Sequence, residues 1–175
     1  MADATSLIFP AGISGESSGT ETAEPDYRMA QDLMFFAYRD FTHAADVILE
    51  ELGLGRAHHR ALHFIGRHPG ITVSELLSIL RITKQSLARV LNELMERGDV
   101  AQSPGLGDRR QRLLRLTRAG EALDRRLFDR QRACLAAAFD RADASSQAAF
   151  QQVMRGIMDD NGRDWLDRGL AGAAP

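Results

Sequence analysis

The chain has 175 residues, of which 44% are hydrophobic and 26% are charged, the length and composition of one globular domain with a buried core. A single cysteine, Cys134, excludes an intramolecular disulfide and a zinc site built from several cysteines. The N-terminus lacks a basic signal region, and no run reaches the roughly 20 apolar residues of a membrane span. We therefore expect a soluble, cytoplasmic protein with no membrane partner.

The formal net charge of −2 is unevenly distributed along the chain. Residues 1–55 carry 2 basic and 10 acidic side chains, or −8, and residues 119–175 carry 8 and 9, or −1. Residues 56–118 carry 12 basic and 5 acidic side chains, or +7. Such a segment is typical of a face that binds a polyanion, although arginines on a solvated surface would give the same count.

The first two segments differ in kind. Residues 1–25 are rich in Gly, Ser, Thr and Glu, which predicts a disordered acidic tail. Over residues 26–52 apolar side chains recur at spacings of three, four and seven, which predicts a helix that glycines end by residue 55. A shorter helix is expected over residues 56–67, and no strand is predicted before residue 100.

Residues 71–97 have the pattern of a helix-turn-helix. Thr72 and Glu75 form a capping box, which predicts a helix over residues 73–79. After a short turn, Thr83 is placed to cap a second helix over residues 84–97. Polar groups able to hydrogen-bond DNA lie off the apolar stripe of this second helix: Lys84, Gln85, Ser86, Arg89 and Asn92.

The remaining chain predicts a hairpin and two helices. The segments "VAQSP" and "QRLLRLT" have β character and flank the turn "GLGDRR", which indicates a short β-hairpin, the wing. Thr117 is expected to cap a helix over about 118–141, and one last helix is predicted from about residue 143 past Trp165, with Gly156 as a weak point. Their apolar side chains exceed what a small domain can bury, which indicates a partner subunit. The predicted fold class is mainly α, a winged helix-turn-helix with additional helices at both ends.

The segments "TKQSLARVLNELMERGDV" and "GDRRQRLLRLTRAGEAL" resemble the MarR family of bacterial transcriptional regulators. The matching wing positions are Asp108, Arg110, Leu116, Thr117 and Gly120, and the resemblance covers roughly residues 28–168. One departure is Asp99, where the family usually has an apolar or aromatic residue, so the wing is expected to pack somewhat differently.

The resemblance implies a homodimer that binds double-stranded DNA. Residues 26–55 and 118–170 would be dimerisation helices, and residues 56–117 would be the DNA-binding region. Arg110 would enter the minor groove, oriented by Asp108, while Arg109 and Arg112 would contact phosphates. Arg115 could face DNA or its own subunit.

Roles for the helix-turn-helix residues follow from their positions. Lys84, Gln85, Ser86 and Arg89 would lie in the major groove. Thr72, Ser74 and Thr83 stand at helix starts, where their hydroxyls could contact phosphate or serve only as caps.

Three histidines, His58, His59 and His63, fall on the second helix. His59 and His63 have the i,i+4 spacing of zinc ligands, but "HRALH" lacks the glutamate base of a zinc hydrolase. The resemblance instead suggests His43, His59 and His63 as lining for a small ligand, and Cys134 is interpreted as a buried structural thiol.

The predicted function is a sequence-specific dimeric regulator, a repressor relieved by a small ligand or chemical signal, and not an enzyme. It would need no cofactor, and its operator would be a near-palindrome that mirrors the dimer. The alternatives are a winged-helix scaffold that binds protein, a metal-responsive sensor and a metal-dependent enzyme using the histidines.

Overall fold

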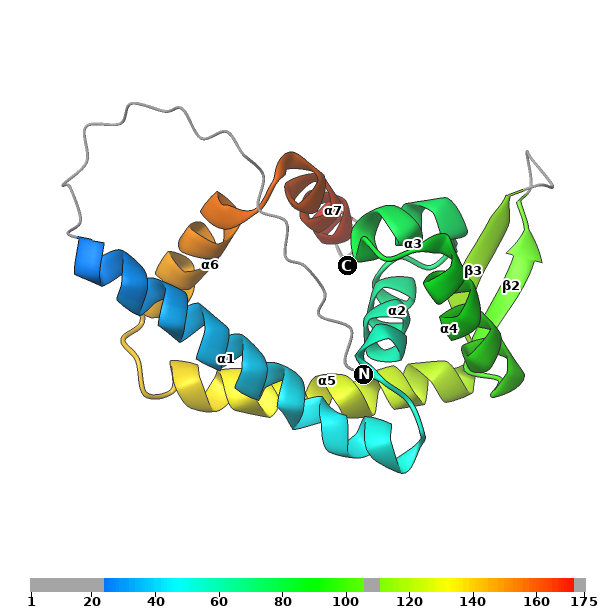
Figure 1. Cartoon of the computed structure of the whole chain (residues 1–175), viewed down its shortest axis with the longest axis horizontal. Coiled ribbons are helices and arrows are strands. Elements are labelled where there is room, and N and C mark those ends of the chain that lie inside the picture. The colour runs from blue at the N-terminus through cyan, green and yellow to red at the C-terminus, as the bar shows by residue number, and fades with distance from the viewer. Residues whose placement is uncertain (1–23, 106–110, 172–175) are drawn as a thin grey trace.

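The computed structural model describes residues 24–105 and 111–171. The order of elements (Figure 1) is α1 (Glu24–Glu51), α2 (Arg56–Arg67), β1 (Ile71–Thr72), α3 (Val73–Leu80), α4 (Lys84–Glu96), β2 (Val100–Pro104), β3 (Arg112–Leu116), α5 (Arg118–Phe139), α6 (Ser146–Ile157) and α7 (Asp160–Ala171). The predicted tail, residues 1–25, lies almost wholly outside the described residues, and α1 begins two residues earlier than predicted.

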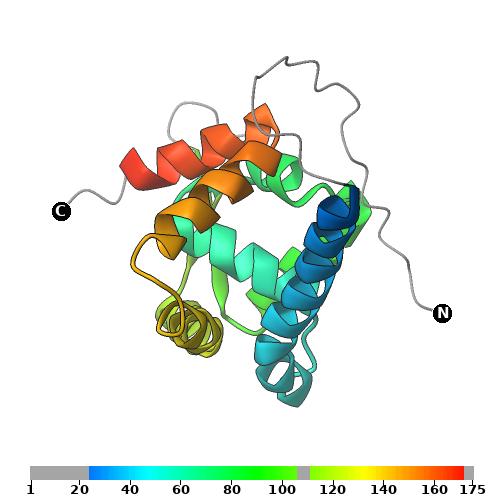
Figure 2. The same ribbon diagram turned by 90° about the vertical axis from the view of Figure 1, so that its left-hand side faces the viewer.

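The winged domain, residues 56–117, occupies one end of the molecule, and α1 and α5 pack against each other and extend away from it (Figure 1). In Figure 2, where α5 is seen end-on, α6 lies above α5 and α1 lies to its right. Helix α7 returns to the winged domain and packs against α3. None of the described helices is both long and apolar enough to span a bilayer.

The hydrophobic core lies inside the winged domain and under the first half of α5. Its largest fully buried side chains are Leu49, Leu62, Ile65, Leu76, Leu87, Leu94, Leu114 and Leu127. They come from every helix from α1 to α5 and from β3, so burying them fixes the helix-turn-helix relative to the sheet and to α5.

The predicted caps of the helix-turn-helix are confirmed. The Glu75 backbone N–H donates to the Thr72 hydroxyl oxygen over 3.2 Å, and the Thr72 N–H donates to the Glu75 carboxylate over 2.9 Å. Thr83 likewise accepts from the Ser86 N–H over 3.1 Å. Gly98 follows the end of α4 with φ +78°, a left-handed backbone conformation that would be strained for a residue with a side chain.

The prediction of no strand before residue 100 is wrong. Ile71 and Thr72 form the short strand β1, which pairs antiparallel with β3 in the register Ile71↔Leu114, so the sheet has three strands in the order β1-β3-β2. Two residues are too few to show alternation, and Ile71 also precedes the cap of α3. The strand forms because it pairs with the distant β3, and the Gly70 backbone N–H, just before β1, donates to the Leu114 carbonyl over 2.8 Å.

The prediction of one last helix is also wrong, since the chain breaks into α6 and α7. Met158, with ψ 146°, is extended, and the Gly162 N–H donates to the Asp159 carboxylate over 2.8 Å at the start of α7. The break lies just after Gly156, the predicted weak point. It lets α7 turn back onto the winged domain, where Asp159 pairs with Arg81.

Asp99, the departure from the family pattern, is buried at the junction of α4 and β2. Arg97 Nε donates to its carboxylate over 2.9 Å, so the burial of the charge is compensated by an ion pair. The Asp99 backbone carbonyl accepts from the Thr117 N–H over 3.0 Å, which holds the start of α5 against the end of α4.

Candidate nucleic-acid interface

Helix α4 separates its apolar and polar side chains as predicted. Leu87, Val90, Leu91 and Leu94 are buried in the core. The recognition face is exposed along the opposite side of the helix and consists of Lys84, Gln85, Ser86, Arg89 and Asn92. It offers donors and acceptors of the kinds that recognise base edges.

At the start of α4 the hydroxyls of Thr83 and Ser86 lie 2.8 Å apart, and both residues are exposed. The N-terminus of this helix therefore presents two hydroxyl groups together with its free backbone N–H groups. A helix start of this kind favours phosphate oxygens.

At the start of α3 the two candidates differ. Ser74 is exposed, whereas the Thr72 hydroxyl donates to the Glu75 carboxylate over 2.7 Å. The capping function of Thr72 is thus confirmed, and phosphate contact by either residue stays a prediction.

Arg89, the arginine of the recognition face, is paired within its own helix. Its Nε donates over 2.9 Å to Glu93, one turn further along, whose other carboxylate oxygen lies 2.7 Å from His58 Nε2 on α2. Hydrogen bonds from Arg89 and then from His58 lower the pKa of Glu93. The sequence prediction missed Glu93 and His58 as partners, although the i,i+4 spacing of Arg89 and Glu93 was visible.

The wing contains β2 and β3, paired antiparallel from Val100↔Leu116 to Pro104↔Arg112. Arg112 is exposed at the start of β3. Arg115 is also exposed, and its guanidinium lies against Gly70 of its own subunit. The predicted wing-tip residues Asp108, Arg109 and Arg110 lie outside the described residues.

The histidines do not form one cluster. His58 is bonded to Glu93, whereas the ring of His63 contacts that of Phe64 at a centroid distance of 5.1 Å. His43 is exposed on α1 and lies 3.4 Å from Asp46. Within residues 24–105 and 111–171, no three His, Cys, Asp or Glu side chains gather to hold a metal ion.

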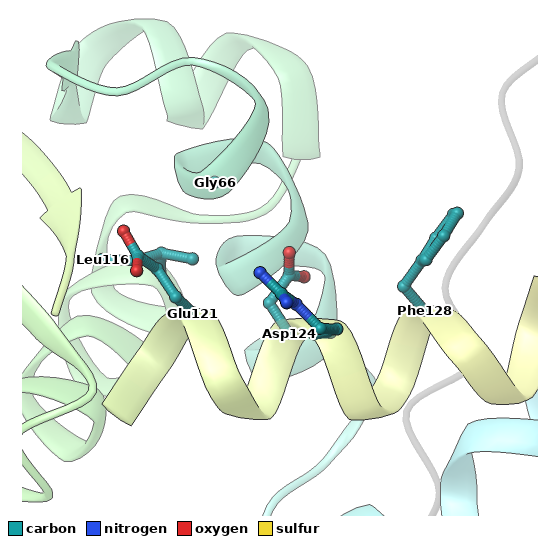
Figure 3. A pocket seen from close by; sticks show the side chains of 6 residues that line it. Gly66, Leu116, Glu121, Asp124 and Phe128 are labelled. Atoms are coloured by element: carbon teal, nitrogen blue, oxygen red, sulfur yellow. The ribbon is translucent and has the colours of Figure 1, made fainter. Parts of the chain in front are cut away.

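A cavity of about 260 Å³ lies between α2 and α5. Asp124 points into it from α5 toward Gly66 on α2, as Figure 3 shows. Burial raises the pKa of the Asp124 carboxyl. On α2, burial lowers the pKa of His59 and the charge of His63 lowers it further, while the charges of His59 and Asp124 attract each other. The cavity is lined by Gly66, Leu116, Glu121, Asp124, Arg125 and Phe128.

A second cavity, of about 430 Å³, lies where α7 meets α2 and α3. His63, Phe64 and Trp165 are among the side chains that line it. Burial lowers the pKa of His63, and the charges of Arg67 and His68 lower it further. Of the three histidines suggested as lining for a ligand, His63 lines one of these cavities, whereas His59 and His43 line neither.

The interpretation of Cys134 as a buried thiol is wrong for the single chain, in which Cys134 is exposed. It lies on the second half of α5, beyond the winged domain. Residues 132–138 around it are all exposed, so the apolar pattern of this helix did not lead to burial within the described chain.

Two capped helices with an exposed recognition face, followed by a β-hairpin, define a winged helix-turn-helix protein. A model of the MarR family matches residues 52–111. The chain is 48% identical over 132 residues to the HTH-type transcriptional regulator PetP of Rhodobacter capsulatus, a match covering 75% of this chain and 80% of PetP. The chain therefore belongs to the MarR family of transcriptional regulators.

Solved structures agree on the fold. The crystal structure of Streptococcus pneumoniae FabT in complex with DNA is 19% identical, with a TM-score of 0.61 over 75% of this chain and 94% of that chain. A MarR family protein of Mycobacterium tuberculosis in complex with p-aminosalicylic acid is 24% identical, with a TM-score of 0.54 over 73% and 96%. At these identities the likeness concerns the fold alone.

Proposed function

We propose that this protein binds a near-palindromic site on double-stranded DNA as a homodimer and represses transcription until a small ligand or chemical signal releases it. The recognition face carries this proposal. Its polar side chains are all exposed and lie opposite the buried stripe that fixes α4 in the domain. The core thereby holds helix α4 in place while the proposed base-contacting groups stay exposed toward a major groove.

Exposed apolar side chains support the dimer. Large hydrophobic residues are exposed on α1, α5 and α6, three helices outside the winged domain: Tyr27, Met29, Leu33, Met34, Phe35, Phe36, Tyr38, Val47, Phe128, Leu135, Phe150, Val153 and Ile157. A soluble monomer rarely exposes so many together. A second copy of the chain would cover them and bring two winged domains to the DNA.

The proposed contacts divide between bases and backbone. Lys84, Gln85 and Arg89 would recognise base edges in the major groove. Lysine and arginine match the acceptors of guanine, and the glutamine amide matches the acceptor and the amino donor of adenine. Ser86 can contact either a base or a phosphate. Phosphate contacts are assigned to Thr83, Ser74 and Thr72 at the helix starts and to Arg109 and Arg112 in the wing, and the minor-groove contact to Arg110 with Asp108 as its partner.

Release by a ligand is supported by the two cavities at the borders of the winged domain. A molecule bound between α2 and α5 would contact the domain and the long helix that leaves it, and so would change their relative orientation. Two half-sites about one helical turn apart must match the separation of the recognition helices, so a small rotation lowers affinity. The relative from Mycobacterium tuberculosis, with p-aminosalicylic acid bound, is consistent with this proposal.

The proposal is tested by selecting DNA fragments from a random pool with the purified protein and titrating the selected site with salt. We expect a near-palindrome of roughly two helical turns. If about 6–10 phosphates are contacted, the affinity should fall roughly 10³–10⁵-fold between about 50 and 200 mM salt. A flat salt response, or no enrichment of any sequence, would contradict DNA binding and favour a protein-binding scaffold.

A further inference from the structure

We propose that Glu93 and His58 are positioning residues for Arg89, so that sequence selectivity depends on a side chain of α2 that does not itself touch DNA. This inference rests on the proposed function, in which Arg89 contacts a base. It adds to the site two residues that neither the family resemblance nor the sequence pattern assigned.

The carboxylate of Glu93 is shared between the two neighbours. One oxygen accepts the Arg89 Nε–H over 2.9 Å, and the other lies 2.7 Å from His58 Nε2. Because both oxygens have partners on different helices, the carboxylate cannot rotate without breaking one bond. Through Glu93, the position of the Arg89 side chain therefore depends on α2 as well as on its own helix.

The ring of His58 is fixed from both sides. The Gly55 backbone N–H donates to His58 Nδ1 over 3.0 Å, so Nδ1 is the unprotonated nitrogen and Nε2 carries the hydrogen that is donated to Glu93. The residue is only 9% exposed, which prevents the ring from turning into solvent. Gly55 lies in the turn between α1 and α2, so the chain of bonds runs from that turn to the recognition face.

The Arg89 side chain is 82% exposed, and an unpaired arginine in water would sample many rotamers. Pairing Nε with Glu93 restricts the guanidinium and leaves its Nη groups free for the two acceptors of a guanine edge. An exposed ion pair adds little to stability, so the effect is expected in selectivity and not in folding.

The test uses the full-length protein and the site selected from random DNA. Selectivity is defined as the ratio of affinities for that site and for a site changed at the base pair whose preference Arg89→Ala abolishes. We expect Glu93→Gln to lower this ratio by roughly three- to tenfold, a part of the discrimination that one base contact supplies. Affinity for random DNA should rise, because a negative charge near the phosphates is removed.

A double-mutant cycle separates positioning from a direct role. In an Arg89→Ala background, Glu93→Gln should not weaken binding to the selected site, because the group that Glu93 positions is gone. A merely structural loss would instead weaken binding of the double variant to the selected site below that of Arg89→Ala, and would also lower the melting temperature without DNA.

Two substitutions of His58 form a matched pair. His58→Gln places a donor near the position of Nε2 and gives up the acceptor for Gly55, whereas His58→Asn keeps an acceptor near Nδ1 and loses the donor to Glu93. We expect His58→Asn to reduce selectivity more than His58→Gln, and we expect that difference to disappear in the Glu93→Gln background.

The outcomes that overturn the inference differ from those that overturn the proposed function. Three outcomes would each overturn the positioning of Arg89 and leave the DNA-binding function standing. They are full selectivity in Glu93→Gln, weaker binding of the double variant than of Arg89→Ala to the selected site, and an Arg89→Ala variant that loses its preference at no base pair. A protein without any DNA selectivity would overturn the proposed function and this inference with it.

Discussion

Gly120 occupies the point where α4, the wing and α5 meet. It is buried in the first turn of α5, and a Cβ placed there would overlap the backbone carbonyl oxygen of Asp99. The Asp99 carbonyl cannot move away freely, since it accepts the Thr117 N–H. Glycine is therefore required at this position because a side chain would collide with the Asp99 backbone, and not because the backbone adopts a positive φ.

We expect Gly120→Ala to lower the free energy of unfolding by about 3 kcal/mol or more, because relief of the overlap must separate α5 from the end of α4. Urea unfolding at one fixed protein concentration measures the change. The same substitution at Gly156, where an added Cβ would meet open space, is the control and should stabilise α6 by roughly 0.5–1 kcal/mol. Equal unfolding curves for Gly120→Ala and the unmodified protein would contradict this account.

His63 gives the protein a predictable response to acid. Burial, with Arg67 and His68 nearby, holds the pKa of its imidazole below the ordinary 6.5. Because the folded-state pKa is depressed, the contribution to stability is present above the unfolded value and is lost as pH falls through the folded one.

We therefore expect the free energy of unfolding to decrease from about pH 7.5 to about pH 5, and His63→Gln to make this decrease shallower. Chemical denaturation at a series of pH values measures both slopes. His43→Gln, at an exposed position, serves as the control. A His63→Gln variant with the same slope as the unmodified protein would show that His63 is not responsible.

At the scale of the element, the start of α4 combines two roles that substitutions can separate. The Thr83 oxygen caps the helix, and the same hydroxyl is proposed to face phosphate. We expect Thr83→Ala to lower the free energy of unfolding by about 1 kcal/mol, because the Ser86 N–H loses its acceptor.

Thr83→Asp should restore the cap and the stability, since aspartate caps well, but it should weaken DNA binding more than Thr83→Ala because a carboxylate repels phosphate. Thermal unfolding without DNA and binding to the selected site are measured for both variants. Equal DNA affinity in the two variants would show that this helix start does not face the DNA backbone.

Sequence predicted those elements whose signals are local. The starts of α3, α4 and α5 are set by Thr72, Thr83 and Thr117, each within three residues of the N–H it caps. Strand β1 depends instead on Leu114, 43 residues away from Ile71 in the pairing. The break before α7 has a local sign in Gly156, but the pairing of Asp159 with Arg81, 78 residues distant, could not be predicted from any local pattern.

The site divides in the same way. The recognition face was predictable because helical periodicity separates it from the buried stripe. The bond between His58 and Glu93 was not predictable, because it joins residues 35 apart on two helices whose packing only the fold determines. A histidine on a half-apolar helix carries no sequence signal that distinguishes a metal ligand from a hydrogen-bond donor.

At the scale of the whole molecule, one subunit is incomplete as a packed structure. The core is built around the winged domain, yet α1 and α6 expose large apolar side chains within the described chain. The exposed Cys134 on α5 has the same explanation. In the proposed dimer, the helices at both ends of the described chain would supply the surface for a second copy, and the winged domain would supply the surface for DNA.

Phe35→Glu tests this division of the molecule. Phe35 is 64% exposed on α1, so within one subunit the substitution removes little packing, whereas in a dimer it would bury an unpaired carboxylate. We expect sedimentation equilibrium to show a dimer for the unmodified protein and a monomer for Phe35→Glu, with the helical circular dichroism signal retained. A monomer contacts one half-site, so the selected site should bind at least about 100-fold more weakly, as the second winged domain no longer binds at high effective concentration.

Arg89→Ala is the control, because it should reduce selectivity while the dimer persists. A Phe35→Glu protein that stays dimeric would place the subunit contact elsewhere, and a monomer that keeps full affinity would show that one winged domain is sufficient for binding.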